Sequence, residues 1–346
     1  MKVRKKVISD LTLCYCVAPL NYHGEDCFLV ASEKEYACLL FDRHGNQLEE
    51  VWPQPGGTMS AVQYPGSDGA FLATHKFYSP NNCKEARLVL CVPENGKWKI
   101  ICCAELPYVH RFDILERGGQ YYVIACCIKS GYEGKDDWRF PGMTLAAPLP
   151  TLEALCAGEQ LKFTLLRDGM LKNHGYCRTG KDGDTAGLVT CDDGVYRFTP
   201  PAQPDGAWQS ERLIADATSD VVPVDFDNDG EDELLTLSPF HGDTLRVYKK
   251  QNGVYTEVYH YEKPIEFAHA ICAGRICGEN MAIVGHRKGA RDLLAVRWDG
   301  AGYRVELLDH DVGPANAMHM VVDGQDVIVS ANREINEVGY YVLTAD

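Results

Sequence analysis

Histidines recur at nearly regular intervals along this chain of 346 residues. Four histidines and one aspartate each stand where a short apolar segment begins: His110, His174, Asp220, His269 and His319. Neutral imidazole binds divalent metal ions and titrates near neutral pH, and a carboxylate adds an oxygen ligand. These residue types predict a divalent metal site, its metal unidentified, if the fold brings the positions together.

Further polar residues follow the second apolar segment of each repeat. We predict that four of them and one loop tyrosine act in acid/base chemistry: His75, His241, His286, Lys129 and Tyr132. Those predicted to contact substrate are Arg111, Trp138, Arg139, Arg287 and Arg333. Together with a metal ion, such groups can remove a proton alpha to a carbonyl and expel water or a sugar leaving group.

Seven copies of one pattern carry these residues. Each copy has an apolar segment, a glycine-containing turn, a second apolar segment, a segment with aromatic residues, and an outer segment that often follows Asn-Gly or Asp-Gly. Consecutive copies start 46 to 64 residues apart, beginning near Cys14. Short strands repeated at this period are typical of a β-propeller. We predict an all-β, seven-bladed propeller of four-stranded blades that forms a single domain over residues 1–346.

The last copy has room for only three strands, at Met320–Val322, Val327–Ser330 and Gly339–Leu343. Near the N-terminus, Val3–Ile8 reads as a strand with no local partner. A ring of blades closes without an open edge when one terminus supplies the missing strand. The sequence therefore predicts that Val3–Ile8 is the outer strand of the last blade.

In a propeller, the start of the innermost strand and the end of the second strand lie on the same face. Seven of the eleven histidines thus map to one mouth of the central channel. The third copy also has a long loop, Lys129–Gly142, which we expect to close over a substrate through Tyr132, Trp138 and Arg139. The alternatives are that each histidine is a hydrogen-bonded structural residue, that the loop is a solvated insertion, and that the channel holds only water.

An acidic loop, Asp225–Glu233, is the most specific motif in the chain. Carboxylates at its first, third, fifth and ninth positions and a glycine at the sixth allow it to wrap a hard cation such as Ca²⁺. The predicted calcium ligands, with Glu231 contributing its backbone carbonyl, are Asp225, Asp227, Asp229, Glu231 and Glu233. The loop resembles the FG-GAP or VCBS repeat loop, which implies a structural Ca²⁺ in an integrin-type propeller blade. The alternative is an acidic turn that holds no metal.

The whole pattern resembles the propeller part of aldos-2-ulose dehydratase-like sugar lyases. The features that carry this resemblance are the acidic loop, the histidine-lined channel and the number of blades. It implies a metal-assisted lyase or dehydratase that acts on a small sugar or keto-sugar by proton abstraction and β-elimination. The alternative is a non-catalytic propeller that binds a carbohydrate or a protein partner.

Composition narrows the partners. A net charge of −15 argues against nucleic-acid binding and against an anionic membrane surface. Neither a signal peptide nor an apolar run long enough to span a bilayer is present, so we expect a cytoplasmic protein. The fifteen cysteines lie mostly within apolar segments, where we expect them to serve as small buried residues in a reducing compartment. Homo-oligomerisation is left open.

Overall fold

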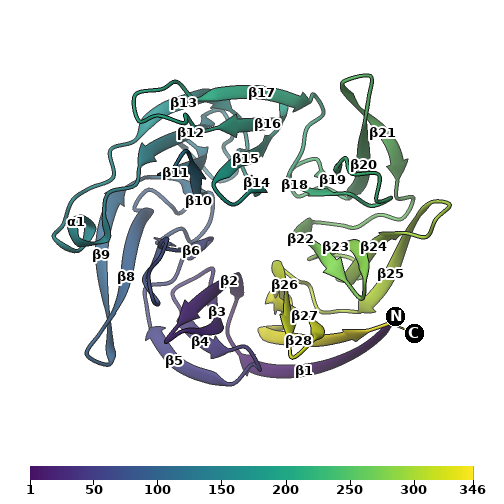
Figure 1. Cartoon of the computed structure of the whole chain (residues 1–346), viewed down its shortest axis with the longest axis horizontal. Helices are drawn as coiled ribbons and strands as arrows, with labels where there is room; N and C mark the ends of the chain where they lie inside the picture. The colour runs from purple at the N-terminus through teal and green to yellow at the C-terminus, as the bar shows by residue number, and fades with distance from the viewer. Residues whose placement is uncertain (346) are drawn as a thin grey trace.

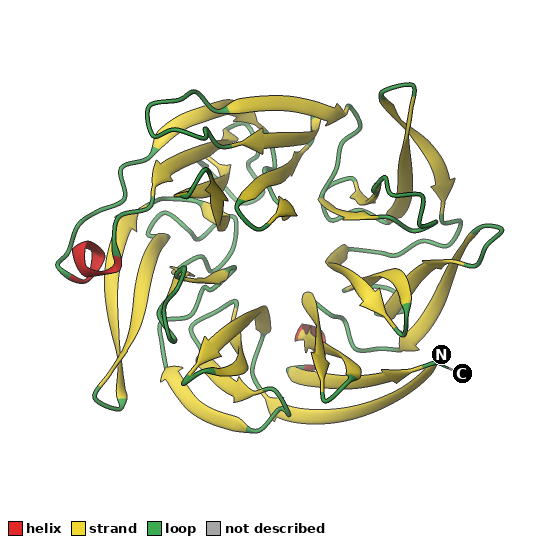
Figure 2. Cartoon of the chain, viewed as in Figure 1, coloured by secondary structure: helices red, strands yellow, loops and turns green. Residues whose placement is uncertain are grey.

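The computed structural model of the chain describes residues 1–345. Seven blades of four antiparallel strands surround a central channel (Figure 1). Strands account for nearly all of the regular structure, as Figure 2 shows. Blades 3 and 4 are joined by a single residue pair, Arg117 at the end of the inner strand of blade 3 with Asp184 at the start of the second strand of blade 4. The predicted all-β, seven-bladed propeller is confirmed.

The first four blades follow one another along the chain, each running from the channel outward. Blade 1 comprises β2 (Cys14–Tyr22), β3 (Glu25–Ser32), β4 (Cys38–Asp42) and β5 (Gln47–Trp52). Blade 2 comprises β6 (Ala61–Gln63), β7 (Phe71–His75), β8 (Arg87–Glu94) and β9 (Lys97–Glu105). Blade 3 comprises β10 (Val109–Arg117), β11 (Gln120–Lys129), β12 (Pro141–Pro148) and β13 (Thr164–Met170). Blade 4 comprises β14 (Tyr176–Lys181), β15 (Asp184–Cys191), β16 (Gly194–Thr199) and β17 (Gln209–Ile214).

The last three blades complete the ring. Blade 5 comprises β18 (Asp220–Val224), β19 (Glu233–Ser238), β20 (Thr244–Gln251) and β21 (Val254–His260). Blade 6 comprises β22 (Ala268–Ile276), β23 (Glu279–His286), β24 (Leu293–Trp298) and β25 (Tyr303–Asp309). Blade 7 comprises β26 (Asn316–Val322), β27 (Gln325–Asn332), β28 (Glu337–Thr344) and, from the other end of the chain, β1 (Lys2–Asp10).

The N-terminal strand closes the ring as predicted. β1 pairs antiparallel with β28, with Val3 opposite Leu343 and Val7 opposite Gly339. Figure 1 shows β1 along the outer edge of blade 7, where Lys2 lies opposite Thr344. Lys5 secures the strand, since its ammonium lies 2.6 Å from Glu337 and 2.9 Å from Asp309 of blade 6. Without β1, β28 would present an unpaired edge.

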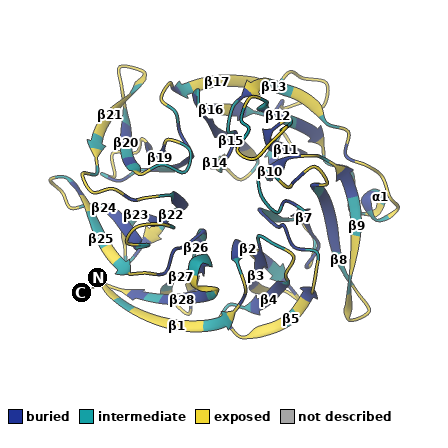
Figure 3. Cartoon of the chain, turned by 180° about the vertical axis from the view of Figure 1, so that it is seen from behind, coloured by how far each residue is buried: buried dark blue, intermediate teal, exposed yellow. Residues whose placement is uncertain are grey.

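The apolar core lies between neighbouring blades. The second strand of most blades is the most buried element, because strands flank it on both sides and a neighbouring blade covers each face. Figure 3 shows this burial near the channel and the exposure of the outer strands. All fifteen cysteines are free thiols, and most are buried, as expected for small apolar residues. Burial raises the pKa of thiols such as Cys16, to about 12.

Local sequence signals account for most of the connections. The Asn95-Gly96 and Asn252-Gly253 turns have positive φ at both residues, as a tight hairpin between twisted strands requires. Short helices occur in two connections. α1 (Leu152–Cys156) is capped by Thr151, and η1 (Arg333–Ile335) follows β27. Among residues 1–345, no helix has the length and apolar character needed to cross a membrane.

Candidate metal centre

Backbone bulges place three polar side chains at one end of the channel. At the start of the inner strand of blades 1, 3 and 6, one extra residue interrupts the pairing: Tyr15, His110 and His269. A bulge redirects the side chain of the extra residue. All three side chains are buried and meet across the channel, although their blades are not adjacent.

Two more histidines join them. His174 immediately precedes blade 4, and His241 follows the second strand of blade 5. The ring of His174 lies 4.5 Å from that of His110, 5.0 Å from that of His241 and 5.1 Å from that of His269. We call His110, His174, His241 and His269 the histidine cluster. In this cluster, one ring nitrogen from each of His174, His241 and His269 lies within 4.8 Å of the other two.

Hydrogen bonds select the tautomer of the cluster histidines. Nδ1 of His110 lies 3.0 Å from the carbonyl oxygen of His174, and Nδ1 of His269 lies 2.7 Å from that of Ala315. A carbonyl oxygen only accepts, so both Nδ1 atoms carry the proton and both Nε2 atoms present lone pairs. Nδ1 of His174 lies 3.1 Å from a carboxylate oxygen of Asp220, the arrangement that commonly orients metal-binding histidines.

The cluster has more lone pairs than protons. The Tyr15 hydroxyl lies 3.1 Å from Nε2 of His269 and 3.3 Å from Nε2 of His110, but its one proton can satisfy only one of them. Nε2 of His174 and Nε2 of His241 are buried without a hydrogen-bond partner among the described residues. Unpaired buried acceptors are costly unless something binds them. A divalent cation would complete this arrangement of nitrogen ligands.

The protonation state suits metal binding. Burial, reinforced by the neighbouring His174, holds the pKa of His110, His241 and His269 well below the ordinary value for histidine. These rings are therefore neutral at physiological pH, the form that coordinates metals. Burial also raises the pKa of Tyr15, so its hydroxyl keeps its proton.

Aromatic residues cover the cluster at the channel mouth. His241 has a left-handed backbone with φ of 49°, which is uncommon outside glycine and concentrates at functional sites. Its ring is stacked between Phe240 and Phe267, at centroid distances of 3.8 and 4.1 Å. Trp138, from the long loop of blade 3, lies 5.1 Å from Phe240. We call Phe240, Phe267 and Trp138 the aromatic cap.

Three of the histidines predicted for the site lie outside the cluster. His75 faces Trp52 of blade 1 at 4.5 Å, and burial lowers its pKa to about 4. Both ring nitrogens of His286 form hydrogen bonds within the turn that follows it. Nδ1 lies 2.9 Å from the carbonyl oxygen of Lys288, and Nε2 accepts from the backbone N–H of Asp292 at 3.2 Å. His319 lies 2.7 Å from Asp326.

The placement of His319 at a strand start is wrong. β26 begins at Asn316, so His319 lies three residues inside the strand. Its Nε2 contacts Asp326 of β27, beyond the turn that joins the two strands, and its ring packs over Gly274 of blade 6. Asn316 instead occupies the strand start of blade 7, where its side chain bonds Arg111 and the carbonyl of Tyr15.

The long loop of blade 3 contributes one side chain to the cap. Lys129 is fully buried, donates to the carbonyl of Asp137 at 2.8 Å and lies 4.1 Å from the Trp138 ring, so it anchors the loop. Tyr132 packs against Tyr108 of its own blade. Arg139 is exposed and pairs with Glu133 and Asp137, so it does not extend toward the cluster. Of the three residues predicted to cover the site, only Trp138 reaches the aromatic cap.

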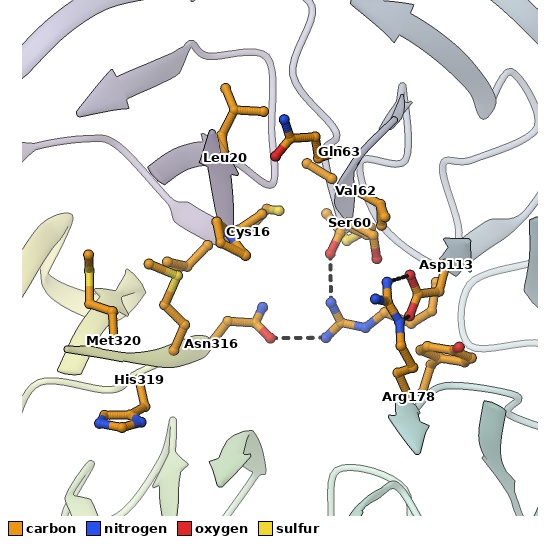
Figure 4. A pocket seen from close by; sticks show the side chains of 18 of the residues that line it. Cys16, Leu20, Ser60, Val62, Gln63, Asp113, Arg178, Asn316, His319 and Met320 are labelled. Carbon is orange, nitrogen blue, oxygen red and sulfur yellow. Dashed lines mark hydrogen bonds and ion pairs between the residues drawn. The ribbon is translucent and has the colours of Figure 1, made fainter. Parts of the chain in front are cut away.

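The predicted substrate-binding arginines differ in their surroundings. Arg287 pairs with Glu334 at 2.8 Å and lies over Phe267 of the cap. Arg333 pairs with Glu33 and Glu334, which links blades 7 and 1. Arg111 instead lines a cavity of about 650 Å³ in the channel, beyond the cluster. Figure 4 shows part of its wall, including Asn316, His319 and the ion pair of Arg178 with Asp113.

Asp220 connects the cluster to this cavity. Its carboxylate bonds His174 and the Ser219 hydroxyl, and the residue also lines the cavity wall. Sequence reasoning missed Tyr15, Asn316 and Phe267. Tyr15 and Asn316 stand at strand starts like the predicted histidines, so aligning all seven copies by strand start rather than by histidine would have included them.

The acidic loop joins β18 to β19, and a lysine side chain lies among its carboxylates. The Lys249 ammonium lies 2.6 Å from Asp227, 2.6 Å from Asp229 and 2.8 Å from Glu233. Asp225 accepts the backbone N–H groups of Asp229 and Gly230. Any calcium ion bound by the predicted ligands would therefore compete with an internal cation.

Comparison with known proteins supports the architecture. No family model matches the sequence, and no curated protein matches it. Among solved structures, a streptogramin B lyase is similar over 99% of this chain and 98% of its own, with a TM-score of 0.62 and 13% identity. The β-propeller domain of Swd1 from Myceliophteria thermophila is similar over 99% of this chain and 100% of its own, with a TM-score of 0.59 and 10% identity. At these identities the likeness shows the propeller fold alone.

Proposed function

We propose that this chain is a metal-dependent lyase that acts on a small sugar or keto-sugar. The ion would be held by His174, His241 and His269, with Asp220 orienting His174. Two observations carry the proposal. One nitrogen from each of His174, His241 and His269 lies within 4.8 Å of the other two, and Nε2 of His174 and of His241 is buried without a hydrogen-bond partner among the described residues. The resemblance to aldos-2-ulose dehydratase-like enzymes supports the same chemistry.

Tyr15 and His110 are the residues best placed to move protons. When bound, a divalent ion would polarise a carbonyl oxygen and acidify the adjacent C–H group. Nε2 of His110 accepts that proton as the C–H bond breaks. Tyr15 gives its proton to the departing β-oxygen as the C–O bond breaks, so the products are an unsaturated carbonyl compound and water. The proton on His110 then returns to Tyr15 across their 3.3 Å contact.

A non-catalytic binding role is the second candidate, and the burial of the cluster favours it. His110, His174 and His269 are only 3%, 1% and 2% exposed, and the aromatic cap lies over the mouth. A metal ion enclosed in this way would stabilise the packing of the blades around the channel. The outer face of the propeller would then bind a carbohydrate or a protein partner. This candidate requires the metal but no turnover.

Metal analysis of the purified chain tests the proposal. We expect about one transition-metal ion per chain by mass spectrometry, and its loss in His174→Ala and His269→Ala. The matched control is His23→Ala, because His23 is an exposed histidine in a turn of blade 1. A wild-type chain that neither retains nor binds a divalent metal contradicts the metal centre.

Activity then separates the two candidates. Incubation of the metal-loaded chain with keto-sugars should produce the ultraviolet absorbance of an unsaturated carbonyl product. Tyr15→Phe should abolish that signal while metal content stays unchanged, because the hydroxyl supplies the proton and the ion is held by other residues. A full metal complement without turnover on any keto-sugar would favour the binding role.

A further inference from the structure

We infer that the channel cavity binds a small carboxylate, with the Arg111 guanidinium as its ionic partner. This names the substrate class of the proposed enzyme and in that sense rests on the proposed function. Carboxylate binding is nevertheless measurable without the metal and without turnover. The inference begins from a charge in the channel that has no counter-ion.

Arg111 forms no ion pair with a carboxylate anywhere in residues 1–345. Its two protein partners are neutral oxygens, the carbonyl of Met59 at 2.6 Å and the side-chain amide of Asn316 at 3.2 Å. A guanidinium has five N–H donors, so about three remain for a ligand. A permanently charged group held in a half-buried channel is stabilised by an anion.

The surroundings of Arg111 hold it in a fixed position. Asn316, which accepts from the guanidinium, also donates to the backbone carbonyl of Tyr15 at 2.8 Å. The guanidinium lies 5.6 Å from the centre of the Tyr15 ring. Partners from blades 1, 2 and 7 therefore position a group that belongs to blade 3. Such preorganisation suits the planar, two-point recognition of a carboxylate.

The other arginine of the cavity provides an internal comparison. Arg178 bonds both carboxylate oxygens of Asp113, with its Nε 2.9 Å from one of them, so its charge is already balanced (Figure 4). The remaining acidic residues of the lining form no ion pair with Arg111. Asp220 is bonded by His174 and Ser219, and Asp26 is exposed to solvent.

The position and size of the cavity are consistent with the proposed chemistry. About 650 Å³ accommodates a monosaccharide or a similar small molecule. Arg111 follows His110 directly in the chain and its guanidinium lies 5.6 Å from the centre of the Tyr15 ring, so a carboxylate held by Arg111 would lie on the cavity side of the residues proposed to move protons. A sugar acid fits this site better than a neutral sugar.

Calorimetric titration of the chelator-treated chain tests the inference. The probes are D-glucuronate and malonate, with D-glucose as the neutral control matched in size to glucuronate. We expect at least one carboxylate to bind, and glucuronate to bind at least tenfold more tightly than glucose. Arg111→Gln should abolish the preference, and Arg111→Lys should restore part of it. Arg304→Gln, on the outer surface of blade 6, should leave binding unchanged.

Asp113→Asn is a second variant that tests the inference even if Arg111→Gln fails to fold. Asp113→Asn preserves the side-chain oxygen that accepts the Ile114 amide but releases the charge of Arg178. It should increase carboxylate affinity several-fold. No binding of either carboxylate, or equal affinity for glucuronate and glucose in both wild type and Asp113→Asn, would overturn the inference. A chain that binds carboxylates but contains no metal would refute the proposed enzyme and leave this inference standing.

Discussion

Individual hydrogen bonds determine what the histidine cluster can bind. Carbonyl oxygens of neighbouring blades accept from Nδ1 of His110 and His269, and this leaves the opposite nitrogens with lone pairs, of which the Tyr15 hydroxyl can satisfy one. The same burial that keeps these rings neutral also makes them costly to protonate. The cluster is therefore expected to couple both metal affinity and folding stability to pH.

Stability of the metal-free chain should fall as pH decreases below about 6.5, the ordinary histidine pKa. The folded-state pKa is lowered to about 4 for His75, and it is also lowered for His110, His241 and His269. Below about pH 6.5 the unfolded chain therefore binds more protons than the folded chain. Each histidine then costs up to about 1.4 kcal/mol per pH unit until its folded-state pKa is reached. Urea unfolding at several pH values in chelator measures this.

The matched variant for this prediction is His75→Phe, which preserves an aromatic ring against Trp52. It should reduce the slope of stability against pH between about 6.5 and 4. A midpoint of urea unfolding that stays constant from pH 7.5 to 5.5 would contradict the predicted protonation states.

Connections between strands determine which side chains reach each site. Bulges at the start of β2, β10 and β22 turn Tyr15, His110 and His269 into the channel. His241 follows β19, and its own left-handed backbone conformation places its ring beside theirs. On the opposite side of blade 5, the β18–β19 loop gathers three carboxylates around Lys249 of β20. In this loop the Lys249 ammonium lies beside three of the residues predicted to bind calcium.

Replacement of Lys249 should make the acidic loop dependent on calcium. Lys249→Met leaves the buried Glu233 and its neighbours without a cation, so we expect a loss of about 3 kcal/mol of unfolding free energy in chelator. Millimolar Ca²⁺ should restore much of this loss by binding the vacated carboxylates. Thermal unfolding with and without Ca²⁺ measures the effect.

Lys250→Met is the control for that experiment, since Lys250 is the exposed neighbour on the same strand. It should change stability little and show no new response to Ca²⁺. If Ca²⁺ raised the unfolding temperature of the wild-type chain as much as that of Lys249→Met, the ion would displace the lysine readily. That result would agree with the calcium site predicted from the sequence.

Closure of the ring joins the two ends of the molecule. β1 pairs with β28 over eight residue pairs and brings Lys5 to carboxylates of blades 6 and 7. The channel residues come from all parts of the ring, so both the cluster and the cavity depend on a closed ring. Asn316 of blade 7, for example, positions Arg111 of blade 3.

Deletion of residues 1–10 should therefore open blade 7 and expose the edge of β28. We expect a marked decrease in thermal unfolding temperature and concentration-dependent association, because an unpaired edge recruits other strands. Size-exclusion chromatography and thermal unfolding measure these effects. Val7→Ala, an exposed position on β1, is the control and should remain close to wild type. A truncated chain that is equally stable would show that β1 is dispensable for closure.

The sequence alone determined the architecture of this protein. The seven strand repeats, the Asn-Gly hairpins, the missing strand of the last blade and its replacement near Val3 are all encoded by short-range patterns of residue type. The polar strand starts predicted that five residues approach one end of the channel; His110, His174, Asp220 and His269 do, and His319 does not. Periodicity can carry this information because strand alternation and turn geometry are local properties.

Only the tertiary structure decided which residues meet. A shift of one residue in register reverses the face on which a strand side chain lies, and sequence pattern does not mark a bulge. Tyr15 contacts the cluster and His241 belongs to it, while His75, His286 and His319 contact other residues. Lys249 reaches the acidic loop from the next strand, and Arg111 is left without a counter-ion, because these outcomes depend on contacts between separate strands and blades.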